Sequence, residues 1–211
     1  MDTTQLFRWA GLATLLSGIL LPMGFVLHPP ELAAEMDTVQ WSLVHLLMLL
    51  SAMAGILGFT GLYGRHAGQM GKLGLVGFVL FYIAHPLFAG LMFFEAFIVP
   101  SLSIVTPEFV EGFATGEASG AFNVVLPLMG LLYSLGGLLF GLAIFRAKIL
   151  PRWATTMTIL GAVPFGIQPA LPGFVGVLSV LALGIGLIGL GYALWTEKST
   201  SPTFNHAVLQ A

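Results

Sequence analysis

The sequence predicts an all-α, polytopic integral membrane protein, a single-domain bundle of six transmembrane helices over residues 1–211. The first observation is composition, because 57% of the residues are hydrophobic and only 8% are charged, against about 25% charged in a soluble domain. The second is that the apolar residues form long continuous runs. The third is that every lysine and arginine falls on one side of the six runs. So few charges cannot cover a water-facing surface, so we expect lipid to be the main solvent.

Each apolar run is about as long as the 20 residues that a helix needs to cross the hydrocarbon core. The runs must be helical, since lipid offers no partners to free backbone N–H and C=O groups. Their continuity, without short alternating segments, argues against a membrane β-barrel. The expected spans lie near residues 6–27, 40–63, 73–99, 121–145, 151–171 and 173–195.

The segments between the spans alternate in charge. Loops 28–39 and 100–120 contain acidic residues, among them Glu31, Glu108 and Glu117, and no lysine or arginine. All seven basic residues fall on the opposite side: Arg8, Arg65, Lys72, Arg146, Lys148, Arg152 and Lys198. The positive-inside rule then predicts that both termini, including the tail 196–211, are cytoplasmic.

Local signals mark several helix ends. Asp37, followed three residues later by Gln40, predicts a capping box at the start of the second span. Thr106 before Pro107 predicts a short helix in the outer loop, on the membrane surface or over the bundle. The four tryptophans lie at span ends, as an aromatic belt at the membrane interface predicts: Trp9, Trp41, Trp153 and Trp195.

Small residues recur at helical spacing and predict close helix contacts. Such stripes occur in the second, fourth and sixth spans: Ser51, Gly55 and Gly58; Gly130, Ser134, Gly137 and Gly141; Ser179, Ala182, Gly186, Gly189 and Ala193. Gly137 and Gly186 are expected at helix crossings.

Ionisable groups inside a membrane are costly and are therefore functional candidates. His45 lies about a turn and a half inside the outer end of the second span, and Glu95 about one turn inside the outer end of the third. With His28 at the outer end of the first span, they form the candidate polar site. His85 and Tyr82 share a face of the third span and are secondary intramembrane polar candidates, with His85 about 15 Å deeper than Glu95.

The candidate polar site fits more than one kind of chemistry. His45 and Glu95 suit proton exchange, because imidazole titrates near neutral pH, and together with His28 they would also suit zinc or another divalent metal. A buried interhelical contact that only fixes packing is the alternative. A b-type haem needs two histidines at matching depth. His28 with His45 meets that condition, whereas His45 and His85 differ in depth by about 13 Å.

Other functional classes find no support in the sequence. The absence of cysteine excludes disulfides, thiolate metal sites and cysteine nucleophiles. The net charge of −2 does not indicate a nucleic-acid partner. No phosphate-binding loop or metalloprotease motif is present, so nothing indicates an enzyme, and the sequence requires no cofactor. His66 and His206 are expected to be ordinary solvated side chains of cytoplasmic segments.

One stretch resembles a known group of proteins. Residues 145–154 read F-R-A-K-I-L-P-R-W-A, and this segment resembles the basic L-P-R-W turn of small uncharacterised multi-span bacterial membrane proteins. G-L-Y-G-R at 61–65 and G-Y-A-L-W at 191–195 are similar to other pieces of those proteins. The resemblance implies a bacterial plasma (inner) membrane location and implies no activity.

These observations favour a membrane protein that binds or moves a small solute or a proton through His45, Glu95 and His28 near the outer leaflet. A non-catalytic accessory or scaffold subunit of a membrane complex is one alternative, and a b-type haem electron carrier is another. The expected partners are the lipid bilayer, a small solute or proton, and a second copy or a subunit of a membrane complex.

Overall fold

A computed structural model describes residues 3–114 and 120–197 of the chain, and all regular structure in these ranges is helical. The elements are α1 (Thr3–Val26), α2 (Ala33–Met36), α3 (Val39–Phe97), α4 (Val99–Val105), α5 (Pro107–Ala114), α6 (Phe122–Ala147), α7 (Arg152–Gly166), η1 (Gln168–Ala170) and α8 (Gly173–Thr196). Four of them, α1, α3, α6 and α8, are long and apolar enough to cross a membrane. The all-α membrane class predicted from the sequence agrees with this architecture.

Helix α3 folds back on itself at Gly71. This glycine has φ 59° and ψ −160°, outside the helical region, and it divides α3 into arms 39–70 and 72–97. The arms are antiparallel, because Tyr63 stacks on Phe78 with ring centroids 4.5 Å apart and Phe59 meets Phe81 at 4.8 Å. The prediction of a loop at 64–72 is thus wrong in detail, since helical backbone continues past Arg65 up to Gly71.

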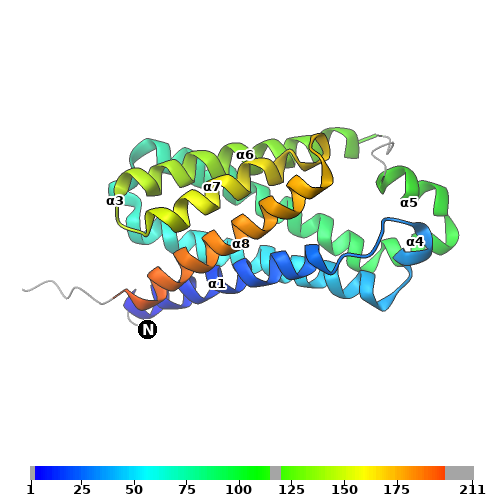
Figure 1. The fold of residues 1–211 in the computed structure, drawn as a ribbon, viewed down its shortest axis with the longest axis horizontal. Coiled ribbons are helices and arrows are strands. Elements are labelled where there is room, and N and C mark those ends of the chain that lie inside the picture. The colour runs from blue at the N-terminus through cyan, green and yellow to red at the C-terminus, as the bar shows by residue number, and fades with distance from the viewer. Residues whose placement is uncertain (1–2, 115–119, 198–211) are drawn as a thin grey trace, which may run out of the picture.

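The long helices form a closed ring. Helix α1 packs on α3 and α8, α3 packs on α6, and α7 lies between α6 and α8. Figure 1 shows these helices side by side along one common direction, with α4 and α5 displaced to one end. Each pair can therefore bury one face while the opposite faces stay free for lipid.

The fifth expected span, 151–171, is shorter than predicted. Helix α7 ends at Gly166 and the chain continues into the short helix η1. The hydroxyl of Ser134 donates to the carbonyl oxygen of Val163 at 2.7 Å, while the N–H of Ile167 bonds to Pro164. The side chain from α6 thus occupies a carbonyl that another helical turn would use, and Pro164 weakens the helix at the same place.

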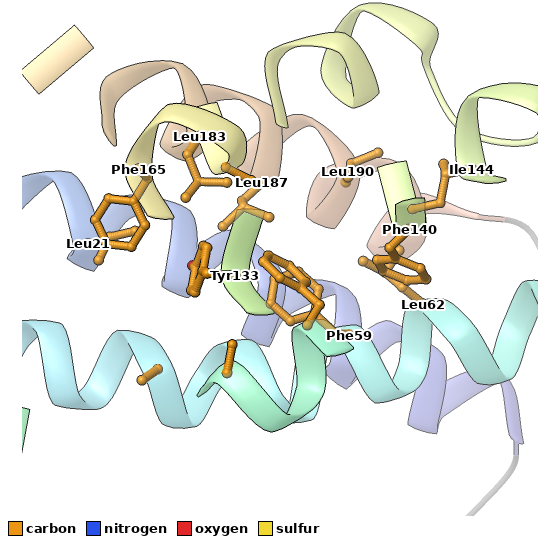
Figure 2. Packing of buried hydrophobic residues seen from close by; sticks show 14 of the residues in the cluster. Leu21, Phe59, Leu62, Tyr133, Phe140, Ile144, Phe165, Leu183, Leu187 and Leu190 are labelled. Carbon is orange, nitrogen blue, oxygen red and sulfur yellow. The ribbon is translucent and has the colours of Figure 1, made fainter. Parts of the chain in front are cut away.

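The hydrophobic core lies inside the ring of long helices. Aromatic and aliphatic side chains from all the long helices meet there, among them Phe59, Tyr133, Phe165 and Leu187 (Figure 2). Backbones approach closely at the small-residue stripes. A Cβ on Gly137 would lie 2.5 Å from that of Ala162, so the predicted crossing at this glycine is confirmed.

The two ends of the bundle differ in charge. At one end the guanidinium of Arg65 forms a bidentate ion pair with Glu197 at 2.7 and 3.1 Å and lies over the ring of Phe7. The α6–α7 junction with Lys148 joins the same end, which we call the basic end. The opposite end carries α2 and α5 with their acidic residues. Lys198 and Glu117 lie outside the described residues.

Candidate functional site

The candidate site forms where α1 ends and α3 begins, at the acidic end. The hydroxyl of Thr38 caps α3 by accepting from the N–H of Trp41 at 3.2 Å. The prediction that Asp37 caps this helix is therefore wrong, because the capping residue is Thr38, one position later. The amide of Gln40, freed from that role, donates to the carbonyl oxygen of Leu27 at 2.9 Å. This bond fixes the end of α1 beside the first turns of α3.

The structure brings His28 and His45 into direct contact. Their Nε2 atoms lie 3.3 Å apart, and their rings meet edge to face with centroids 4.9 Å apart. The Nδ1 of His28 lies 2.6 Å from the carbonyl oxygen of Pro29, and the Nδ1 of His45 lies 2.8 Å from that of Trp41. We call these two side chains the histidine pair.

The partners of the histidine pair define where its hydrogens lie. A carbonyl oxygen only accepts, so the Nδ1 of each ring must be the donor. In a neutral imidazole the other nitrogen is then an acceptor. Two acceptors at 3.3 Å make a hydrogen bond only when one further proton lies between them. A hydrogen bond between the two Nε2 atoms would therefore require one extra proton, shared by the two imidazoles.

Trp41 holds the histidine pair in place. Its carbonyl accepts from His45, and its ring contacts both members of the pair, with centroids 4.6 Å from His45 and 5.1 Å from His28. Its indole N–H donates to the backbone oxygen of Glu95 at 2.9 Å. Trp41 is 2% exposed, so the expectation that it belongs to an interfacial aromatic belt is wrong. Sequence reasoning missed this role, although the four-residue spacing from His45 was a usable signal.

Glu95 belongs to the same neighbourhood but does not form the expected ion pair with His45. Among the described residues, the ion pair within 4 Å is that of Arg65 with Glu197. Glu95 is largely buried in the second arm of α3, and the charged group that acts on it electrostatically is Glu31. Trp41 reaches the backbone of Glu95 and not its carboxyl group. The carboxyl group of Glu95 therefore has an acidic neighbour, Glu31, and no ion-pair partner among the described residues.

Three short helices lie against Trp41 at the acidic end. Met36 of α2, Val99 of α4 and Val110 of α5 are buried against Trp41, and we call this layer the cap. Helix α5 spans 107–114, as predicted from Thr106 and Pro107. The cap covers the indole of Trp41 at the bundle end, while His28 stays half-buried.

The two secondary candidates, His85 and Tyr82, differ in their burial. His85 is buried and donates from Nδ1 to the carbonyl oxygen of Phe81 at 2.7 Å, whereas Tyr82 is 39% exposed. Residues three apart differ by about 60° around a helix. In this helix that difference places His85 on the buried face and Tyr82 on the exposed face. The ring that stacks on His85 is Tyr133 of α6, with centroids 5.1 Å apart. No local pattern in the sequence could identify that partner.

His66 also departs from the expectation of a solvated side chain. It is 1% exposed, and its Nε2 has no hydrogen-bond partner within the described ranges. The helical course of residues 64–70 turns it inward, which a loop would not have done. His206 lies outside the described residues.

The metal and haem expectations can be tested on the geometry. In residues 3–114 and 120–197, no three histidine, aspartate or glutamate side chains lie close enough to hold a metal ion together. Two histidines on opposite sides of a haem iron would be separated by about two metal–nitrogen bonds, about 4 Å, with the macrocycle between them. The histidine pair, at 3.3 Å, leaves no space for a macrocycle.

Comparisons with protein families, with curated proteins and with solved structures find no match to the chain.

Proposed function

We propose that the chain is a six-span protein of a bacterial plasma membrane, with both termini in the cytoplasm, that binds and exchanges a proton at the histidine pair near the outer leaflet. The two arms of α3, 39–70 and 72–97, are each longer than a span requires. With α1, α6 and α8 they account for five passes, and the proposal assigns the sixth to α7, whose 15 residues are continued by η1. The separation of the basic end from the acidic end supports the orientation through the positive-inside rule.

The observation that carries the proton proposal is the direct contact of two Nε2 atoms whose rings already donate from Nδ1. A pair of this kind takes up one proton as a unit, because the second ring stabilises the imidazolium of the first. Deeper in the bundle, the hydroxyls of Ser17 and Ser51 bond at 3.2 Å and supply the next buried polar contact between α1 and α3.

Trp41 provides the readout that tests this proposal. A protonated imidazole quenches an indole in contact with it, and Trp41 touches both rings. In a chain whose other tryptophans, Trp9, Trp153 and Trp195, are replaced by phenylalanine, we expect the fluorescence to fall on acidification. The fall should disappear in His28→Gln and in His45→Gln.

The matched control is His66→Gln, because His66 is buried far from Trp41 at the basic end. It should leave the fluorescence change intact. Fluorescence that does not depend on pH, or that depends on it equally in all variants, would contradict the proposal and favour the accessory-subunit alternative.

A further inference from the structure

We infer that the histidine pair is also a binding site for a late first-row divalent metal ion of the zinc class. This inference rests on the proposed function because the same two Nε2 lone pairs bind either the proton or the metal ion. The site is built from His28 at the end of α1 and His45 in the first arm of α3.

The distance between the two nitrogens supports this inference. Zinc binds histidine nitrogen at about 2.0–2.1 Å in tetrahedral geometry, and two such bonds at about 109° place the nitrogens about 3.3 Å apart. The two Nε2 atoms of the pair are 3.3 Å apart. A linear ion would require about 4 Å and a right-angled arrangement about 2.9 Å, so the pair fits a tetrahedral ion best.

The hydrogen bonds behind the two rings support it independently. Histidines that bind metals usually donate their other ring N–H to a carbonyl or carboxylate, which fixes the tautomer and the orientation of the ring. Both members of the pair do so, to the carbonyl oxygens of Pro29 and Trp41. The structure therefore presents two oriented nitrogen lone pairs at ligand spacing without rearrangement of either ring.

The remaining coordination positions go to water. No third side chain of the usual ligand types completes the set among the described residues, so the site is open and exchangeable. Binding replaces the proton between the rings, so each ion taken up by the protonated pair releases one proton to the solvent.

The test uses the full chain in detergent, purified without a polyhistidine tag, with Zn²⁺ and Co²⁺ as the probes. We expect one Zn²⁺ per chain by calorimetry, with affinity that falls as the pH is lowered. Co²⁺ should give the visible absorption bands of a tetrahedral ion. His28→Gln and His45→Gln should each weaken binding at least about tenfold, while His66→Gln should leave it unchanged.

Two results separate this inference from the proposed function. If Zn²⁺ does not bind, or binds equally to wild type and both variants, while the pH-dependent Trp41 fluorescence persists, the metal inference is overturned and the proton proposal stands. If Zn²⁺ binds and is lost in both variants while the fluorescence does not respond to pH, the metal inference stands and the proton proposal fails.

Discussion

Replacing Gly186 by alanine tests how the bundle is held together. A Cβ at this position of α8 would lie 2.8 Å from the carbonyl oxygen of Ala154 and closer still to the backbone nitrogen of Thr158. Ordinary contacts begin at 3.4 Å, so α7 and α8 must separate by at least about 0.6 Å. Because these two obstructing atoms are backbone, a change in the rotamer of Thr158, whose hydroxyl is also close, cannot relieve the overlap.

The cost follows from that separation. A gap of about 0.5–1 Å forfeits a quarter to a half of each van der Waals contact along the interface, and overpacking of a well-packed core costs about 1–3 kcal/mol. We therefore expect Gly186→Ala to lower the free energy of unfolding by about 1–3 kcal/mol, measured by denaturation with SDS in mixed micelles.

Gly90→Ala is the matched control, since a Cβ on Gly90 meets nothing within 4 Å and the glycine likewise lies inside a long helix. This control should be neutral or stabilising by about 0.5–1 kcal/mol, because alanine favours helix. Equal effects of the two substitutions would refute the close contact of α7 with α8.

Two further predictions concern orientation and the buried histidine at the basic end. The chain has no native cysteine, so a single introduced cysteine can be labelled selectively. In intact cells a membrane-impermeant maleimide should label Glu35→Cys, and it should reach Lys148→Cys only after permeabilisation. The reverse labelling pattern would contradict the proposed topology. His66→Leu removes a buried nitrogen that has no partner in the described structure. The free energy of unfolding should therefore stay constant or rise by up to about 1–3 kcal/mol. A decrease in this free energy of more than about 1 kcal/mol would mean that the nitrogen makes a stabilising bond.

The helical membrane architecture was predictable because lipid imposes strong constraints on sequence. The long apolar runs give the spans and small residues such as Gly137 give the contacts, since both follow from length and side-chain size alone. The fold-back at Gly71 was less visible. A glycine among charged residues reads as a loop, and only the backbone shows that helix continues to within one residue of the reversal.

The candidate site was predictable as a neighbourhood but not as a set of contacts. Depth along the helices places His28, His45 and Glu95 at the same end of the bundle. Depth does not fix rotation, so the sequence paired His45 with Glu95, whereas in the structure His45 faces His28. Trp41 decides this arrangement by occupying the space between His45 and the backbone of Glu95.

The hydrogen bond between the two Nε2 atoms can be detected directly by NMR. In a chain with ¹⁵N-labelled histidine, reconstituted in lipid or detergent, we predict a nitrogen–nitrogen coupling through the hydrogen bond between His28 Nε2 and His45 Nε2. We also predict an attached hydrogen on the Nδ1 of each ring. The coupling should vanish in His28→Gln without loss of the His85 signals. Rings that carry their hydrogens on Nε2, with no coupling at any pH at which the protein stays folded, would contradict a proton shared by the histidine pair.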